Sequence, residues 1–303
     1  MKKIRMPGKL AHVLAFVLAL LLTLTLTMTC LTWQVNRVLT DADMHRAVYL
    51  DSRVTKAQMA RIQARVEEIA REHPFQVETV MDIVNEDAVK AFNSAANAWW
   101  MGLMQPDPVL EAPAFDASDV EAAVREDAVF LENTPSTHYR TVARDDIAYE
   151  VGVAVNKAVL PVRADVLSIV MPKVLEKIDL PVYMGYLAMA PGACLGVSAV
   201  LALLLVLVMI RRLSKAGLYI GAAMMASALC VAGLGVMLYL IGVTGMIAEL
   251  SMLLALQVSL LTKQIALQAG VYVATALILG GGLIALHQAD MNRLGKARRS
   301  IDA

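Results

Sequence analysis

Charged side chains inside apolar stretches are the first place to look for chemistry in this sequence. Four long apolar stretches contain no Asp, Glu, Lys or Arg. Because a charge buried in a membrane is costly and usually marks an ion or proton path, this pattern argues against a proton pump or a secondary transporter. Two histidines, His12 and His287, lie at the ends of such stretches, where we expect an ordinary solvated imidazole.

Candidate metal ligands occur at two places outside these stretches. Asp41 and His45 are four residues apart, and Glu72 precedes His73. Neither pair completes an H-E-x-x-H pattern or a zinc-like cluster, so we expect solvated or locally paired side chains. The sequence also lacks a G-x-S-x-G nucleophile motif and a G-x-x-x-x-G-K-[ST] phosphate loop. We therefore predict no catalytic residues, no metal and no cofactor, and we rank an enzyme last among the functional classes.

Two adjacent tryptophans, Trp99 and Trp100, are the most distinctive side chains outside the apolar stretches. Trp is enriched in interface hot spots and at membrane surfaces, and it is equally a large core side chain. Trp99 continues a 3-4 spacing that begins at Val89 and Phe92, which assigns it to a helix core. Successive helical positions differ by about 100°, so Trp100 is left as the candidate contact for a partner or a membrane surface.

Small and hydroxylated residues within the apolar stretches indicate close helix packing. The candidates are alanines in a small-xxx-small pattern and three consecutive glycines: Ala222, Ala226, Ala228, Ala232, Gly280, Gly281 and Gly282. The first stretch also carries five threonines between Thr23 and Thr32. Their hydroxyls either contact a neighbouring helix or bond to carbonyls of their own helix, and we favour the second interpretation.

Membrane-spanning helices would position these residues. About 20 apolar residues cross the core of a bilayer as a helix, and the predicted spans are residues 10–33, 187–210, 218–241 and 266–287. The first span could instead be a secretory signal. We interpret it as an uncleaved anchor, because a signal core has about 7–15 apolar residues and ends at a small-residue cleavage site, which is missing here.

The segment between the third and fourth spans, residues 242–265, is harder to interpret. Its most apolar part, residues 247–261, also contains Glu249 and Gln257, and the uninterrupted apolar run is too short for a confident crossing. We interpret it as an interfacial or re-entrant helix in an extracytoplasmic loop. The alternative is a fifth span.

The distribution of charge predicts the orientation of the chain. Residues 1–9, 211–217 and 288–303 together carry eleven Lys and Arg against two acids, whereas residues 34–183 carry 15 Lys and Arg against 24 acids. Lys and Arg near span ends are retained in the cytoplasm. We therefore expect cytoplasmic termini, the basic residues 1–9 and 288–303, a cytoplasmic turn at 211–217, and an extracytoplasmic domain at 34–183.

Helix signals recur along residues 34–183. Apolar residues recur at helical spacing, and we expect helix starts at three places: a capping box of Thr55 with Gln58, a cap at Asn85, and a capping box of Ser118 with Glu121. The face of the first helix opposite its apolar positions is charged, with Arg61, Arg65, Glu68, Arg71 and Glu72.

Prolines and junctions set the expected helix ends. Pro74 should end the first helix, and Pro161 and Pro172 should divide the last helical stretch. Residues 34–50 contain no helix breaker and should continue the first span. Residues 151–155 alternate Val with other residues, so a short strand is the alternative there.

The compartment is inferred from cysteines and glycosylation signals. All three cysteines (Cys30, Cys194 and Cys230) fall in predicted spans, and residues 34–183 contain neither cysteine nor an N-x-[ST] sequon. Such a domain has no disulfides although its compartment would permit them. A bacterial plasma membrane is the compartment that this pattern favours.

The fold class predicted from these features is an all-α, polytopic membrane protein with four transmembrane helices and a helical-bundle extracytoplasmic domain. Its plan resembles that of the four-span permease subunits of cell-division ABC transporters, which implies a mechanotransmitting subunit working with a separate cytoplasmic ATPase. The resemblance is one of topology and covers no motif.

The competing functional class is a non-enzymatic binding, sensory or scaffolding protein. We favour it, because it requires no feature that the sequence lacks. The expected partners are the lipid bilayer and an extracytoplasmic protein, peptide or wall component, with no nucleic acid.

Overall fold

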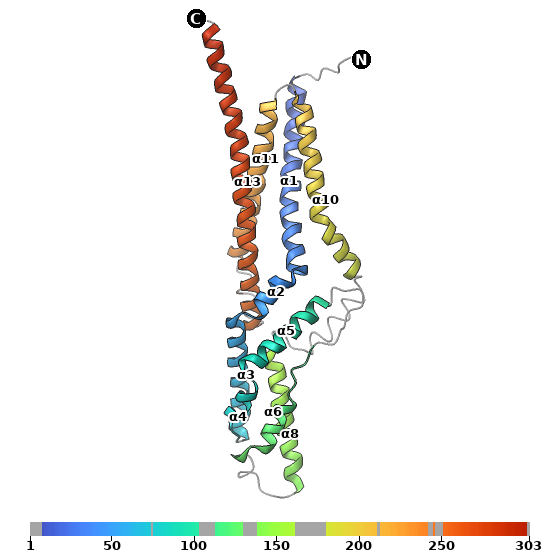
Figure 1. The fold of residues 1–303 in the computed structure, drawn as a ribbon, viewed down its shortest axis with the longest axis vertical. Coiled ribbons are helices and arrows are strands. Elements are labelled where there is room, and N and C mark those ends of the chain that lie inside the picture. Colours follow the sequence, from blue (N-terminus) through green and yellow to red (C-terminus); the bar gives the residue numbers. More distant parts are fainter. Residues whose placement is uncertain are drawn as a thin grey trace. The chain divides into compact units, whose positions relative to one another are not determined.

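The computed structural model describes residues 8–301 except for residues 74, 103–112, 130–137, 161–179, 211–212, 242–244 and 246–250. Within this part the principal elements are all helices and no strand occurs (Figure 1). They are α1 (Gly8–Thr40), α2 (Ala42–Tyr49), α3 (Ser52–Glu72), α4 (Val77–Ile83), α5 (Glu86–Gly102), α6 (Ser118–Glu126), α8 (His138–Val159), α10 (Leu180–Val208), α11 (Leu213–Leu240) and α13 (Met252–Ile301). The predicted all-α fold class is confirmed.

The chain divides into two compact units. We call residues 1–39, 184–242 and 263–303 the membrane unit, and residues 40–183 and 243–262 the helical domain. Four helices are long and apolar enough to cross a membrane, within Lys9–Thr40, Val182–Val208, Leu213–Leu240 and Met252–Arg293. The predicted spans 10–33 and 266–287 lie within two of these helices, and the predicted spans 187–210 and 218–241 extend one or two residues past the ends of the other two.

The membrane unit has a core where α1, α10 and α11 meet. Ala15 and Leu22 on α1, Leu205 on α10 and Ala223 on α11 are buried together. Other large apolar side chains of these helices face outward, for example Leu203, which is 59% exposed. An apolar outer surface of this kind is suited to lipid rather than to water.

The fourth apolar helix is longer than the sequence analysis expects. With 50 residues, α13 extends about 75 Å at 1.5 Å per residue, whereas about 20 residues suffice for a crossing. The separate short helix expected at residues 247–261 is, from Met252 onward, the beginning of α13. No Pro or Gly interrupts the chain between Met252 and Ala269, so nothing in the sequence ends the helix there.

The first turns of α13 belong to the helical domain. Leu253 and Leu260 are buried against Val48 of α2 and Val54 of α3. The helical domain is therefore discontinuous in sequence, and a fragment limited to residues 51–179 would lack both α2 and this part of α13. A fragment meant to fold alone has to include them.

The junction after the first span also differs from expectation. The helix expected to run unbroken through residues 34–50 is interrupted at Asp41, whose backbone is extended. The Asp41 carboxylate accepts a hydrogen bond from the Met44 backbone N–H at 3.0 Å and so caps α2. A capping carboxylate favours a new helix start because it satisfies an otherwise unpaired N–H group.

The cap predicted at Asn85 is confirmed, and both capping boxes are wrong. The Asn85 side-chain oxygen accepts from the backbone N–H groups of Asp87 and Ala88. In contrast, α3 is capped by Asp51, and α6 begins at Ser118 with Asp116 as the acceptor of the Ser118 N–H.

Carboxylates explain the two failed boxes. Asp51 and Asp116 precede the predicted caps, and a negative charge is stabilised near a helix N-terminus. The Ser118 hydroxyl and N–H both donate to Asp116, which lowers the pKa of the Asp116 carboxyl. Thr55 and Gln58 are left in the interior of α3, where both are buried.

The end of α8 agrees with prediction. The helix ends at Val159, two residues before Pro161. Residues 151–155 are helical, so the strand alternative is wrong. Pro74 and Pro172 lie outside the described residues.

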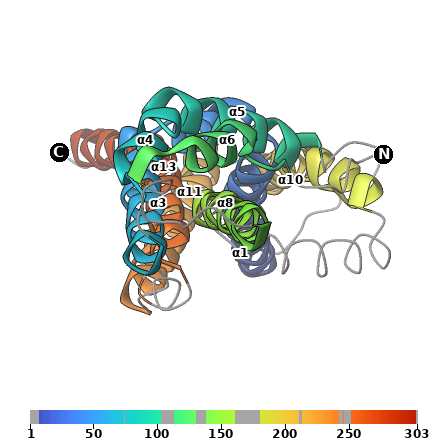
Figure 2. The same ribbon diagram turned by 90° about the horizontal axis from the view of Figure 1, so that it is seen from below.

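Valines dominate the core of the helical domain. The fully buried set comprises Ile62, Val66, Val80, Val84, Val89, Val120, Ala148, Val151, Val155 and Val159. Figure 2, seen along the domain, shows α5 and α6 covering one side of the α3–α8 pair. These apolar positions account for the predicted helical periodicities.

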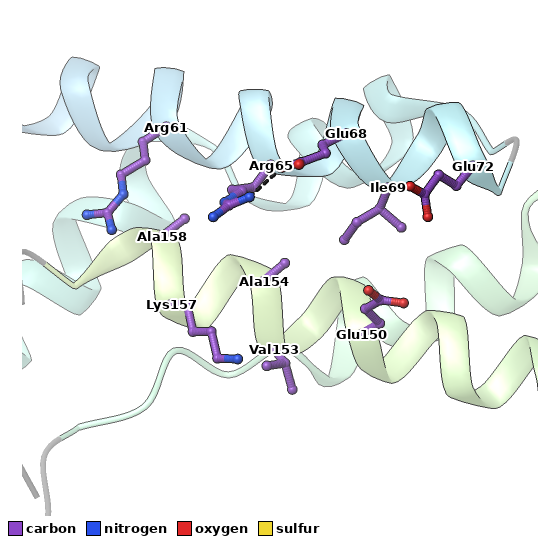
Figure 3. A pocket seen from close by; sticks show the side chains of 10 residues that line it. All are labelled: Arg61, Arg65, Glu68, Ile69, Glu72, Glu150, Val153, Ala154, Lys157 and Ala158. Carbon is purple, nitrogen blue, oxygen red and sulfur yellow. Dashed lines mark hydrogen bonds and ion pairs between the residues drawn. The ribbon is translucent and has the colours of Figure 1, made fainter. Parts of the chain in front are cut away.

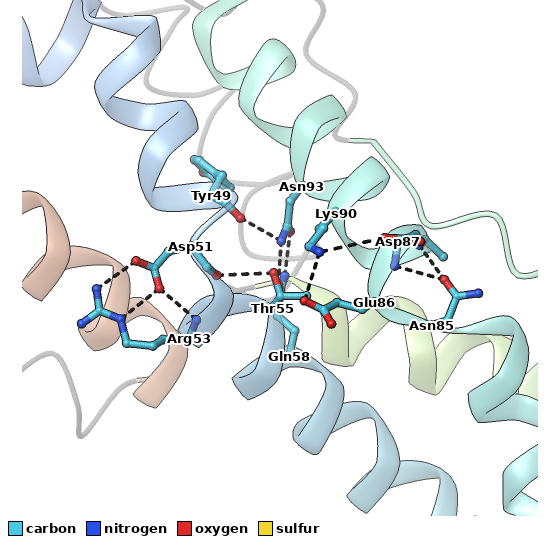
Figure 4. A network of polar contacts seen from close by, with 11 residues as sticks. Tyr49, Asp51, Arg53, Thr55, Gln58, Asn85, Glu86, Asp87, Lys90 and Asn93 are labelled. Atoms are coloured by element: carbon cyan, nitrogen blue, oxygen red, sulfur yellow. Dashed lines mark hydrogen bonds and ion pairs between the residues drawn. The ribbon is translucent and has the colours of Figure 1, made fainter.

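One polar interaction crosses this core (Figure 4). The side-chain amides of Gln58 and Asn93 bond to each other in both directions, at 2.8 and 2.7 Å. The second Gln58 N–H donates to the carbonyl of Val159 at 2.8 Å, and the second Asn93 N–H donates to that of Tyr49 at 3.0 Å. The pair thus satisfies carbonyls at the C-terminal ends of α8 and α2, which have no partner within their own helices.

We predict that Gln58→Met lowers the free energy of unfolding of the helical domain by about 2–3 kcal/mol, because it leaves buried groups without hydrogen bonds. The control Gln63→Met, on the exposed face of α3, should change it by less than about 0.5 kcal/mol. Pulse proteolysis of the full chain in micelles across a urea series measures both. Equal effects of the two substitutions would contradict the assignment.

Candidate functional site

A groove lies between α3 and α8 in the helical domain (Figure 3). Its volume is about 490 Å³, within the range of about 300–1,000 Å³ typical of small-molecule sites. The two helices run antiparallel, so that Arg61 of α3 lies near Ala158 of α8 and Glu72 lies near Glu150. Ile69, Val153, Ala154 and Ala158 supply its apolar lining.

The charges of the groove are sorted by sign along its length. One end is basic, with Arg61, Arg65 and Lys157, and the other end is acidic, with Glu68, Glu72 and Glu150. Like charges from the two helices therefore gather at each end of the groove. Such an arrangement is unfavourable for the protein alone.

The Arg61 guanidinium has a structural role at the basic end. It donates to the carbonyl oxygen of Leu160 at 2.9 Å, just beyond the C-terminus of α8, where a cation is favourable. Burial, and next the nearby charge of Arg65, lower the pKa of Arg61. Arg61 therefore fixes the end of α8 while leaving other N–H groups to face the groove.

Some of the other charged side chains of the groove have no ion pair within the described protein and can bind a ligand. Arg65 forms an ion pair with Glu68. Lys157, Glu72 and Glu150 form no ion pair with any residue that the structure describes. These three side chains are the ones best able to bind a ligand.

The groove was not predicted from the sequence. Four of its residues were predicted to lie on a charged face of the first helix, namely Arg61, Arg65, Glu68 and Glu72, but no pairing of that face with α8 was expected. The available signal was a seven-residue spacing between opposite charges, which occurs in both helices, as in Glu150 and Lys157. Only the pairing of the helices turns this spacing into a site.

The tryptophans are less distinct from each other than expected. The Trp99 and Trp100 rings lie 6.5 Å apart between centroids, and both residues are half-buried. The buried positions of α5 end at Asn97, so Trp99 is not a central core residue. Trp100 as a contact for a partner or a membrane stays a prediction.

The small residues predicted to pack in the membrane differ in their burial on α11 and α13. Ala228 and Gly280 are buried, Ala226 is half-buried, and Ala222 and Ala232 are exposed. A Cβ atom added at Gly281 or Gly282 would meet no described atom within 4 Å.

The closest approach involves a glycine that the sequence analysis missed. A Cβ added at Gly280 would lie 2.7 Å from the Gly221 carbonyl oxygen, and one at Gly221 would lie 2.6 Å from that of Gly280. Gly217 and Gly221 form a G-x-x-x-G pattern, which is the signal for such a contact. The two backbones touch here, and only glycine fits.

We expect Gly280→Ala to destabilise the membrane unit by about 1–3 kcal/mol, because the added methyl overpacks the contact. The adjacent Gly281→Ala should be neutral or stabilising by up to about 1 kcal/mol, because alanine favours the helix. Melting temperatures of the two variants in micelles test this contrast. Identical melting temperatures would refute the proposed backbone contact.

The threonines of α1 bond mainly to their own helix. The hydroxyls of Thr23, Thr27 and Thr29 each donate to the carbonyl four residues earlier, as the favoured interpretation predicts. One of the contacts crosses to α10, where the Ser198 hydroxyl donates to the Thr25 oxygen at 2.9 Å. These threonines therefore serve helix structure and packing.

The structure assigns places to both histidines of the apolar stretches and to Asp41. His12 lies 3.2 Å from the Tyr219 hydroxyl, and Asp41 caps α2. His287 is half-buried at the far end of the fourth span. Within the described parts of the chain, no three His, Cys, Asp or Glu side chains gather as a metal site would require.

Fold and groove together define an all-α membrane protein with a groove-bearing helical domain. Comparison with protein families, characterised proteins and solved structures finds no match. The groove is therefore the feature of this chain that indicates a function.

Proposed function

We propose that the chain is a non-enzymatic binding protein with a sensory or scaffolding role, which acts through its helical domain. The observation that carries this proposal is the groove of about 490 Å³, whose Lys157, Glu72 and Glu150 have no ion pair among the described residues. Concave sites with a few convergent polar groups are where proteins usually bind ligands. In this proposal α13, which contributes to both units, links ligand binding to the membrane.

The proposed setting is a bacterial plasma membrane, with both termini in the cytoplasm and the helical domain outside. The support is the distribution of charge: residues 1–9, 211–217 and 288–303 contain eleven Lys and Arg and only two acidic residues. Lys and Arg near span ends favour the cytoplasmic side.

Cysteine labelling tests this orientation. In a variant with the native cysteines replaced by alanine, a membrane-impermeant maleimide added to intact cells should label Ala122→Cys on α6. It should not label Asn292→Cys on α13 until the membrane is opened. Both positions are exposed. Labelling in the reverse order would overturn the orientation.

Photo-crosslinking tests the binding role. A photoreactive amino acid at Val153, in the groove, should form an adduct with an extracytoplasmic molecule in native membranes. The same amino acid at Ala122, exposed on α6 and outside the groove, should not. Co-purification of a stoichiometric ATPase with no adduct at Val153 would instead support the permease-like alternative.

A further inference from the structure

We propose that the groove between α3 and α8 binds short peptides, about three to five residues long, through their free termini. This inference rests on the proposed binding function and names its ligand class. The peptide carboxylate would lie at the basic end, near Lys157 and Arg61, and its ammonium group would lie at the acidic end, near Glu72 and Glu150.

Charge complementarity is the first argument for this ligand. Arg61 of α3 and Lys157 of α8 line one end of the groove, and Glu72 and Glu150 point toward each other at the other end (Figure 3). A ligand with a negative charge at one end and a positive charge at the other offsets the like charges at both ends of the groove at once. A purely anionic or purely cationic ligand would gain at one end and lose at the other.

The spacing of the charges sets the ligand length. Lys157 and Glu150 are seven residues apart on α8, and Arg61 and Glu72 are eleven apart on α3. At 1.5 Å per helical residue these separations are about 10 and 16 Å. An extended peptide spans about 3.3–3.6 Å per residue, so three to five residues connect the two ends. A single amino acid is too short.

The lining in the middle of the groove determines how the central part of the peptide would be recognised. Its lining there consists of Ile69, Val153 and Ala154, and the backbone groups of both helices are already paired within the helices. The groove therefore offers apolar contact but no donors or acceptors for the central peptide bonds. Recognition depends on charged termini and length, with tolerance for different apolar side chains.

The test uses the full chain in nanodiscs and titration calorimetry. The probe is the tetrapeptide Ala-Leu-Leu-Ala with free termini, compared with the same peptide acetylated and amidated. Charge-assisted hydrogen bonds at the termini are among the strongest available, so blocking them should weaken binding at least about tenfold. The dipeptide Ala-Ala should also bind more weakly.

Variants assign the effect to the groove. Glu150→Gln and Lys157→Gln should each weaken binding of the free tetrapeptide about tenfold. The matched controls Glu126→Gln and Lys56→Gln, on exposed positions outside the groove, should bind as the unaltered chain does. All four substitutions are at the surface, and an unchanged melting temperature verifies the fold of each variant.

Equal binding of free and blocked peptides, or no binding of the free peptide at millimolar concentration, would overturn the peptide assignment. An adduct at Val153 in native membranes would then still support the binding function with another ligand. Loss of both signals would reject the ligand class and the binding function together.

Discussion

The buried amide pair of Gln58 and Asn93 is the interaction on which the helical domain depends. A polar group without a partner in such a core costs about 1–3 kcal/mol, so the pair tolerates only an arrangement in which every amide N–H is satisfied. That arrangement requires the ends of α2 and α8 to lie at the pair, because Tyr49 and Val159 supply the outer acceptors. A valine-rich core alone would accept small shifts between helices, whereas the amides do not.

The groove follows from the same constraint. Gln58 lies one helical turn before Arg61 on α3 and binds the end of α8 through the Val159 carbonyl. The resulting register between α3 and α8 places Lys157 near the arginines and Glu150 near the glutamates. Sliding α8 by about seven residues would pair Lys157 with Glu68 and relieve the repulsion. It would also leave Gln58 without the Val159 carbonyl. The domain therefore keeps its basic and acidic side chains at opposite ends of the groove, where a ligand can neutralise them.

The sequence predicts elements better than their ends or their partners. The four apolar helices, the cap at Asn85 and the apolar faces follow from local pattern. The cap at Asp51 and the acceptor role of Asp116 were missed because several nearby acceptors compete for the same N–H groups, and periodicity does not choose between them. The groove and the backbone contact at Gly221 depend on which helices lie together, and no local pattern contains that information. The length of α13 was missed because its polar residues were interpreted as a boundary.

The most direct test of this account is the distance between α3 and α8. Spin labels at Ala64 and Tyr149, both exposed, can be measured by double electron–electron resonance in a chain without native cysteines. We expect one narrow distance distribution in the parent chain and after Gln63→Met, and a broadened or shifted distribution after Gln58→Met under conditions where the domain stays folded. An unchanged distribution after Gln58→Met would show that the amide pair does not set the register of the groove.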